Sequence, residues 1–216
     1  MTRTHRSLLI VAACIALVVA GVVVLRWKSR LQVEPPPPCG VRCGTDRWSV
    51  KTLTDESAKR VSFTPKQTTV SWLVAQAPPA KLQQASRVSD IECQVWQVTG
   101  RLIAFKSEGD DGDYHLVIAD LNSDSTMIVE IPDSNCAGVC DSPQRIQFDR
   151  ARQAFSAAFG IPSERLHRLS NPVVVTLTGV GFFDRKHKQT GVAANGVELH
   201  PVIDLQPPDT VRRSFP

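Results

Sequence analysis

The segment 197–205 (VELHPVIDL) carries the side chains best suited to chemistry. In a strand, alternate residues point to opposite faces, so Glu198, His200 and Asp204 would share one face. The other face would carry the apolar side chains Val197, Leu199 and Ile203. Imidazole and carboxylate groups bind transition metals and act as general acids and bases near neutral pH. The alternative is that His200 and Glu198 only form hydrogen bonds that hold neighbouring segments in place.

Two more histidines lie on or beside neighbouring predicted strands and extend this set. The candidate catalytic residues are therefore His115, His187, Glu198 and His200. If they converge on one ion at about 2.0 to 2.2 Å, they would support a metal-assisted hydrolase, nuclease-like in its chemistry, with a divalent metal as cofactor. If they are scattered, the domain needs no cofactor and no catalytic role.

Two loops of opposite charge are candidate ligand contacts. The loop 107–113 (SEGDDGD) holds four carboxylates that could collect a hard cation, although the twelve-residue calcium-loop pattern is absent. The loop 185–196 (RKHKQTGVAANG) is basic and could hold an anion, and both loops also fit plain solvated turns. The predicted ligand-binding residues are Arg185, Lys186, His187, Gln189 and Asn195.

Several familiar activities are disfavoured. The chain has no G-x-S-x-G elbow, H-E-x-x-H helix, phosphate-binding loop or dinucleotide glycine motif. The net charge is +4, but five basic residues flank the apolar segment near the N-terminus, which leaves the rest nearly neutral. Nucleic-acid binding normally needs a concentrated basic surface, so nucleic acid is an unlikely partner.

The elements that would position these residues are mostly strands. Apolar alternation and turn residues predict strands at 91–106, 114–120, 125–131, 172–184 and 197–205, with one amphipathic helix at 143–159. In the first strand Trp96, Val98, Leu102 and Ala104 would share a face. Earlier, RWSVKT is expected to form a short strand, and 69–76 a helix or strand.

This order predicts a mainly β domain with one helix, an OB-like five-stranded barrel in the order strand, strand, strand, helix, strand, strand. A β-sandwich and an open α+β sheet are the alternatives. Glycines 100, 179 and 181 would let such a barrel coil tightly.

The N-terminal segment 8–25 (LLIVAACIALVVAGVVVL) has 18 residues without charge, long enough to cross a bilayer as a helix. It predicts a transmembrane signal-anchor, with a cleaved secretory signal as the alternative. The predicted organisation is an anchor at 1–30, a Pro/Cys spacer at 31–44 that includes four successive prolines, a globular domain at 45–205 and a tail at 206–216.

The cysteines indicate which side of the membrane the domain occupies. Two C-x3-C pairs, formed by Cys39, Cys43, Cys136 and Cys140, fit either disulfides or a zinc site, and disulfides fit an exported domain better. The connectivity stays open, and the odd number leaves Cys93 as a candidate buried thiol. We therefore expect a single-pass cell-membrane protein with an extracytoplasmic, periplasmic domain.

The blocks WSVKTLTD, HLVIAD, TMIVEIP, GVGFFD and NGVELHPV, in this order, resemble a group of uncharacterised exported bacterial proteins with an OB-like β-barrel domain. The likeness covers about residues 48–202, and the resemblance implies no particular activity. The membrane segment and the doubled C-x3-C pairs lie outside what the resemblance implies.

Two functions are carried forward. The first is a non-catalytic binding or interaction module of the envelope, whose partner would be a protein, peptide or glycan and which is attached to the membrane by its N-terminal helix. The second is the metal-assisted envelope hydrolase. Metal content would separate them, because the second function requires a bound ion.

Overall fold

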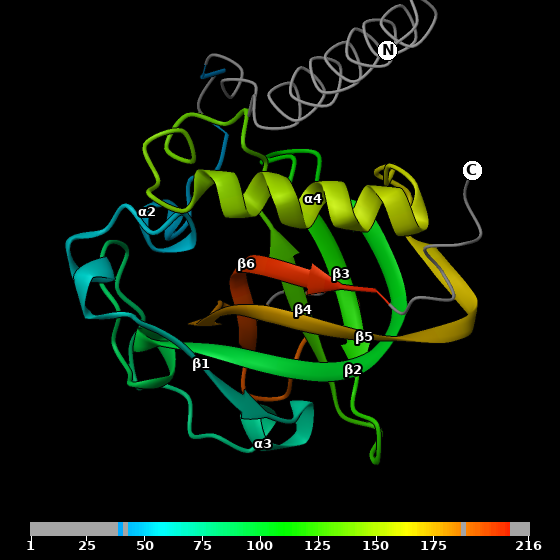
Figure 1. Cartoon of the computed structure of the whole chain (residues 1–216). Helices are drawn as coiled ribbons and strands as arrows, with labels where there is room; N and C mark the ends of the chain where they lie inside the picture. Colours follow the sequence, from blue (N-terminus) through cyan, green and yellow to red (C-terminus); the bar gives the residue numbers. More distant parts are fainter. Residues whose placement is uncertain (1–38, 41–42, 187–188, 208–216) are drawn as a thin grey trace, which may run out of the picture. The chain divides into compact units, whose positions relative to one another are not determined.

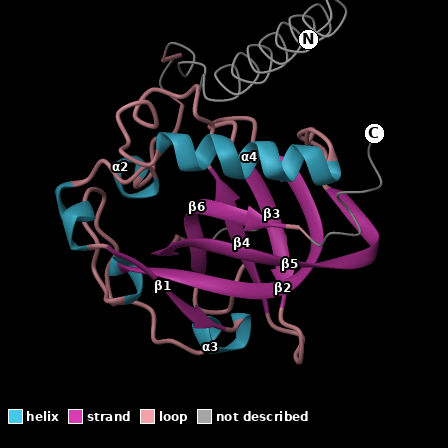
Figure 2. Cartoon of the chain, in the orientation of Figure 1, coloured by secondary structure: helices cyan, strands magenta, loops and turns pink. Residues whose placement is uncertain are grey.

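One six-stranded sheet forms the centre of the described chain (Figures 1 and 2). The computed structural model describes residues 39–40, 43–186 and 189–207. The strands are β1 (Ser62–Thr68), β2 (Gln94–Ser107), β3 (Tyr114–Ala119), β4 (Thr126–Ile131), β5 (His167–Phe183) and β6 (Val197–Gln206). The helices are α2 (Trp48–Lys51), α3 (Val70–Val74) and α4 (Arg145–Phe159), with single 3₁₀ turns at Glu56–Arg60 and Ile91–Cys93. The prediction of a mainly β domain is confirmed.

The strand pairings run in a ring. Neighbours follow the order β1-β2-β3-β4-β6-β5, and β5 pairs back with β2. The pairs β2–β3, β3–β4, β2–β5 and β5–β6 are antiparallel, whereas β4–β6 and β1–β2 are parallel. Because β4 and β6 are parallel, they need a long connection, which α4 and β5 provide.

Strand β2 bends at a register shift between Leu102 and Ala104, which allows it to pair with β3 along one half and with β5 along nearly its whole length. The shift also corrects the predicted face of this strand. Trp96, Val98 and Leu102 do share the main apolar cluster, but Phe105 joins them rather than Ala104. A bulge adds one residue and so reverses the alternation beyond it.

Helix α4 contacts β4 and β6 and lies across one end of the strands in Figure 1. Phe155 and Ala151 pack into the main cluster, together with residues of all the strands except β1. Phe148, which lies about one turn before Ala151 on the same side of the helix, packs instead into a second cluster with Trp48 and Val180. The helix thus joins the two apolar clusters, as its predicted 3.6-residue periodicity requires.

The N-terminal part of the described chain differs from its prediction. The segment RWSVKT contains the helical turn α2 and is not a strand, and α3 adds another short helix, so the expectation of a single helix is wrong. A single helical turn forms its backbone hydrogen bonds between near neighbours in the sequence. Lys51 N, for example, donates to Arg47 O at 3.0 Å.

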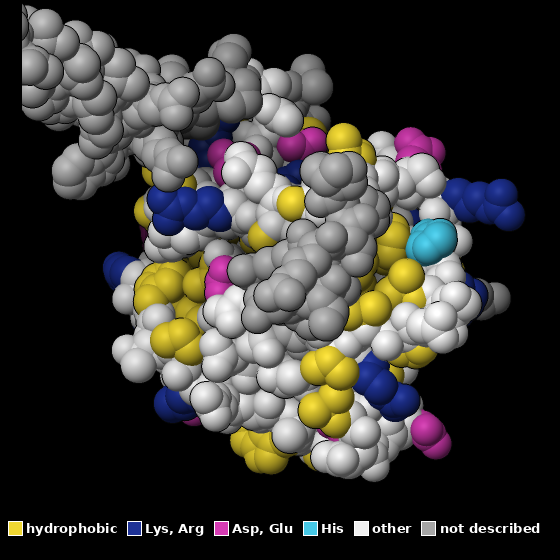
Figure 3. All heavy atoms as spheres, turned by 45° about the vertical axis from the view of Figure 1, so that its right-hand side comes forward, with side chains coloured by type: hydrophobic (Ala, Val, Ile, Leu, Met, Phe, Trp, Pro, Cys, Tyr) yellow, Lys and Arg dark blue, Asp and Glu magenta, His cyan; other side chains and the backbone are white. Residues whose placement is uncertain are grey.

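The predicted membrane segment 8–25 and the tail from 208 onward lie outside the described residues. Within the described part of the chain, no helix is both long enough and apolar enough to traverse a bilayer. On the face in Figure 3, Lys and Arg side chains stand in separate places among Asp and Glu side chains and are not gathered into one patch.

Candidate functional site

Three strands bring their polar side chains to one place. In the β3–β4 hairpin His115 lies opposite Glu130. In the parallel pair β4–β6, Ile128 lies beside Glu198 and Val129 beside Leu199, so the next positions along both strands are Glu130 and His200. The glutamate at the end of β4 is therefore flanked by a histidine from each neighbouring strand.

The resulting contacts form a continuous chain. His115 Nδ1 lies 2.9 Å from Glu130 Oε1 and 3.3 Å from Glu108 Oε1. On the other side of Glu130, its Oε2 lies 2.9 Å from His200 Nδ1, and His200 Nε2 lies 3.1 Å from Asp113 Oδ2. We call these five residues, Glu108, Asp113, His115, Glu130 and His200, the His–carboxylate cluster.

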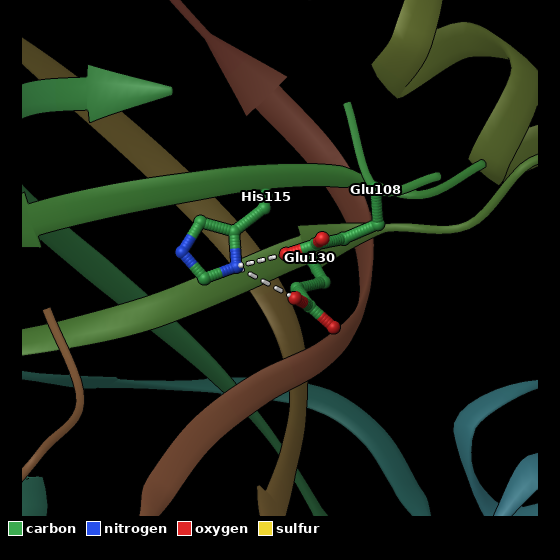
Figure 4. A group of neighbouring side chains, drawn as sticks. All are labelled: Glu108, His115 and Glu130. Atoms are coloured by element: carbon green, nitrogen blue, oxygen red, sulfur yellow. Dashed lines mark hydrogen bonds and ion pairs between the residues drawn. The ribbon is translucent and has the colours of Figure 1, made fainter. Parts of the chain in front are cut away.

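The two ring nitrogens of His115 have different partners. Nε2 lies 3.3 Å from the carbonyl oxygen of Thr190, and Nδ1 lies 2.9 Å from Glu130 Oε1. Nδ1 points toward the oxygens of both Glu108 and Glu130, as Figure 4 shows. Glu108 Oε2 accepts from Lys106 at 2.7 Å, whereas its Oε1 is buried without a hydrogen-bond partner. The Nδ1 nitrogen of His115 and one oxygen each from Glu108 and Glu130 therefore lie close together.

His200 has close neighbours but no hydrogen bonds. Its ring is fully buried, and neither ring nitrogen has a hydrogen-bond partner despite the short contacts to Asp113 and Glu130. Burial opposes the positive charge, yet the two carboxylates raise the pKa of His200 to about 9. Burial raises the pKa of Asp113, while for Glu130 the two histidines outweigh burial and lower the pKa well below its usual range.

Two more charged groups adjoin the cluster. Burial, together with the charges of Glu130 and Asp184, raises the pKa of Glu198 well above its ordinary value, and its Oε2 has no hydrogen-bond partner. Lys51 of α2 is the nearby cation. Burial works against its charge, but the surrounding carboxylates, Glu130 first, raise its pKa above the ordinary value.

A cavity of about 170 Å³ gives access to the cluster from outside. Its lining comes from four parts of the described chain: the segment around α2, the acidic loop, strand β4 and the residues in and next to the basic loop. The lining residues are Gly44, Thr45, Asp46, Trp48, Lys51, Glu108, Asp110, Asp111, Glu130, Asp184 and Gln189. Burial, followed by the charges of Asp113 and Glu130, raises the pKa of Asp111 on this wall to about 7. Carboxylates and one ammonium group thus line a small space to which the cluster contributes Glu108 and Glu130.

The structure brings together two of the predicted catalytic residues, His115 and His200, through Glu130. Glu198 lies two positions before His200 on the same strand and adjoins them. His187 lies outside the described residues. Asp204 is exposed and pairs with Thr178, because register shifts between β5 and β6 break the alternation expected for this strand.

The predicted ligand-binding residues that the structure describes differ in position and in role. Gln189 lines the cavity. Arg185 is exposed at 3.5 Å from Asp46 on the cavity wall, and Lys186 donates to the carbonyl of Ala194. Asn195 has a structural role, since its amide donates to two carbonyls at the end of α3 and its Oδ1 accepts from the backbone of β6. The two predicted loops do border one cavity.

Three members of the cluster, Glu108, Asp113 and Glu130, are absent from the predicted catalytic set. A signal for Glu130 existed. Pairing Asp120 with Ser125 across the predicted turn places His115 opposite Glu130, and the structure has this register. Asp113 is the last residue of the acidic loop and is fully buried, so this loop is only partly a solvated turn.

Two disulfides hold the segment before α2 against the loop that follows β4. The bonds join Cys39 to Cys140 and Cys43 to Cys136, as the disulfide interpretation of the two C-x3-C pairs predicted. Among the described cysteines, Cys93 is not in a disulfide, and it is partly buried. Since Gly44 and Thr45 line the cavity directly after Cys43, the crosslinks fix one of its walls.

Comparison with known proteins leaves the family open. No protein-family model matches the chain. No curated protein matches either. One similar solved structure is described as a candidate aspartyl-tRNA synthetase from Leishmania major Friedlin, with a TM-score of 0.36 and 7% identity over 68% of this chain. The match spans 21% of that structure, about a fifth of its length.

Proposed function

We propose that this protein is a divalent-metal-dependent hydrolase whose metal is held by Glu108, His115 and Glu130 beside the cavity. The observation that carries the proposal is the convergence of one imidazole nitrogen and two carboxylate oxygens, one of them, Glu108 Oε1, buried and without a hydrogen-bond partner. A proton on His115 would serve one carboxylate and leave the other without a partner, whereas a metal ion satisfies all three groups.

The ligand geometry supports this assignment. The three ligand atoms all lie within 4.8 Å of one another. Ligands at about 2.0 to 2.2 Å from one ion stand roughly 2.9 to 3.6 Å apart, which matches the contacts of 2.9 and 3.3 Å at His115. The second ring nitrogen of His115 lies 3.3 Å from a backbone carbonyl oxygen, the usual arrangement that orients a metal-ligating histidine.

The cavity supports a catalytic rather than a purely structural ion. A metal ion beside it would polarise a water molecule and make it nucleophilic at neutral pH. In an ester hydrolysis, the water oxygen would bond to the carbonyl carbon or phosphorus atom while Asp111 on the wall takes the water proton. As the bond from that atom to the leaving oxygen breaks, Asp111 would return the proton to the leaving oxygen. The ammonium group of Lys51, in the same lining, would stabilise negative charge that develops on the substrate.

A non-catalytic binding module is the second candidate. The observation that favours it is the complete burial of His115 and His200, since an ion that is closed off from water serves structure only. The strand order also fits an OB-like barrel, in which strands one to five neighbour each other as 1-2-3-5-4-1. We propose this architecture for β2 to β6, with β1 as an addition.

The proposed location is the exported side of the cell membrane. Two disulfides support an oxidising compartment, because reducing compartments keep thiols free. The apolar segment 8–25 supplies the proposed single-pass anchor.

Hydrolysis of two chromogenic probes, a p-nitrophenyl carboxylic ester and bis-p-nitrophenyl phosphate, tests the proposed function. The full chain with its disulfides intact is stripped with a chelator and reloaded with Mn²⁺ or Zn²⁺. We expect metal-dependent turnover of at least one probe, reduced on the order of 100-fold in Glu108→Gln and His115→Ala. His167→Ala, which changes an exposed histidine outside the cluster, is the matched control and should retain full turnover.

Metal binding without turnover, combined with no exchangeable water on bound Mn²⁺ by proton relaxation, would leave the binding module as the better assignment. A protein that binds neither ion would contradict the metal-dependent hydrolase and would leave a binding module that needs no metal.

A further inference from the structure

We infer that the cluster holds a second divalent cation, bound by Asp113, Glu130 and a ring nitrogen of His200, so that Glu130 bridges two ions. This inference rests on the proposed function, because the first ion belongs to the site at Glu108, His115 and Glu130. It also narrows the substrate of that site to a phosphoester.

The first step is the geometry of His200. Its two nitrogens lie 2.9 Å from Glu130 Oε2 and 3.1 Å from Asp113 Oδ2, yet none of these contacts has hydrogen-bond geometry. The two ring nitrogens point to opposite sides of the imidazole, so only one of them can bind a given ion, and one of the two contacts matches the separation of two ligands of that ion, whose lone pairs are directed at the ion and not at each other. Short contacts without hydrogen bonds are therefore expected of metal ligands and costly for an ordinary buried ion pair.

The second step is burial. His200 and Asp113 are both fully buried, and Asp113 Oδ2 has no hydrogen-bond partner, although Asp113 Oδ1 accepts from the backbone of Asp133 at 3.0 Å. An unpartnered carboxylate oxygen in such a position is destabilising, because it has lost its hydrogen bonds to water and gained none in the protein. One oxygen each from Asp113 and Glu130 and one nitrogen of His200 lie within 4.8 Å of one another, as close as the ligand atoms of the first site.

The third step is the position of Glu130 between the two sites. Its Oε1 faces His115 and its Oε2 faces His200. A carboxylate whose two oxygens face different ligand groups is suited to bridge two ions at about 3.5 to 4 Å, the separation used by two-metal phosphatases and nucleases.

Charge supports the phosphoester as substrate. The cavity wall and the cluster together hold seven carboxylates: Asp46, Glu108, Asp110, Asp111, Asp113, Glu130 and Asp184. Lys51 is the ammonium group in this lining. A phosphoryl group carries negative charge and would be repelled from such a site, whereas two divalent ions would attract it and stabilise both the attacking and the leaving oxygen.

Mn²⁺ titration of the chelator-stripped full chain, followed by calorimetry and electron paramagnetic resonance, tests the inference. We expect two Mn²⁺ per chain and the exchange-coupled spectrum of two ions that share a bridging ligand. Asp113→Asn, a change of similar shape, should retain one ion with an uncoupled six-line spectrum. Glu108→Gln should also retain one, because it removes a ligand of the first site only. His167→Ala should bind two coupled ions as the parent does.

The outcomes separate this inference from the proposed function. One Mn²⁺ in the parent, lost in Glu108→Gln and unchanged in Asp113→Asn, would overturn the second site while the first stands; His200 is then an imidazolium between two carboxylates. Two uncoupled ions would overturn the bridge. No bound Mn²⁺ would overturn the proposed function as well. The parent spectrum needs no variant, so a variant that fails to fold does not affect the test.

Discussion

At the scale of single residues, one fully buried charge outside the cluster belongs to Arg47. Its guanidinium group donates to Glu92 at 2.6 Å and to the carbonyl of Phe183, and both side chains of the Arg47–Glu92 pair have no exposed surface. Glu92 in turn accepts from the backbone amides of Phe183 and Val88. The pair therefore fastens α2 to the end of β5, beside the cavity.

Removal of one partner of this pair should be far more damaging than removal of both. Arg47→Met leaves a buried carboxylate without its cation, and we expect a loss of about 3 to 5 kcal/mol in the free energy of unfolding. The double variant Arg47→Met/Glu92→Leu should recover part of that loss. Urea denaturation of the single and the double variant checks this. Arg185→Met, which changes an exposed arginine, is the control and should change the free energy of unfolding by less than about 1 kcal/mol. Equal losses in the single and double variants would contradict it.

Asp120 provides a prediction about pH. Burial opposes its charge, but the backbone amides of Ser71 and Asn122 donate to its oxygens, both at 2.9 Å, and lower its pKa below the ordinary 3.8. A carboxylate with a depressed pKa in the folded state stabilises the protein above pH 3.8, and this contribution disappears as the pH falls through the folded-state pKa.

Asp120→Ala should therefore cost about 1 to 2 kcal/mol near neutral pH and progressively less in acid. Urea denaturation over a pH series measures the difference between variant and parent. Asp124→Ala, an exposed carboxylate in the same turn, is the control and should change stability by less than about 0.5 kcal/mol throughout. A cost for Asp120→Ala that stays constant into strong acid would exclude the proposed role of its charge.

At the scale of elements, the close approach of β5 to the turn before β2 depends on Gly181. A Cβ atom at this position would lie 2.2 Å from the carbonyl oxygen of Ile91, a backbone atom that cannot move by itself. β5 pairs with β6 at this point, and Phe183, two residues on, accepts from Arg47. A displaced β5 would therefore disturb both the strand ring and the buried ion pair.

Gly181→Ala should destabilise the fold by about 2 to 3 kcal/mol, as overpacking against a rigid neighbour does. Gly109→Ala is the matched control, because its Cβ would meet only the side chain of Glu164 at an ordinary 3.5 Å. Thermal denaturation should show a clear loss in the first variant and little change in the second. A tolerated Gly181→Ala would mean that the turn at Ile91 moves freely.

The order of the elements could be predicted from the sequence, but their exact registers could not. Strands β2 to β6 and helix α4 follow apolar periodicities of two and 3.6 residues, which are local properties. Bulges in β2 and between β5 and β6 depend on tertiary pairing, so the sequence wrongly grouped Ala104 with Trp96 and Asp204 with His200. The hairpin of β3 and β4 has no bulge, and only there would local reasoning have sufficed to find a pair of the cluster, although the predicted catalytic set does not include Glu130.

The burial of Asp113 could not be predicted for a related reason. Nothing local distinguishes it from the exposed Asp110 of the same loop. Its position is set by Asp133, which follows β4 and whose backbone amide donates to Asp113 Oδ1. A site that combines residues of β3, β4, β6 and a loop therefore becomes visible only once the strand ring is known.

At the scale of the whole molecule, the two disulfides are arranged so that each protects against loss of the other. Cys39–Cys140 spans 101 residues and Cys43–Cys136 spans 93, and one loop lies inside the other. Once either bond has closed the long loop, the second closes only a short ring made of residues 39–43 and 136–140. Chain entropy therefore assigns a large stabilisation to the first bond and a small one to the second.

Removal of either bond alone, in Cys39→Ala/Cys140→Ala or Cys43→Ala/Cys136→Ala, should cost about 3 kcal/mol, whereas removal of all four cysteines should cost about 7 kcal/mol. Urea denaturation of the three variants measures these values. The affinity of the cavity for metal should follow the same order as the stability of the variants, because the lining residues Gly44, Thr45 and Asp46 lie next to Cys43. We expect Mn²⁺ affinity to fall on the order of 10-fold only when both crosslinks are absent and the wall is released. If a variant that lacks one disulfide loses as much stability as the variant that lacks both, loop closure is not the source of the stabilisation.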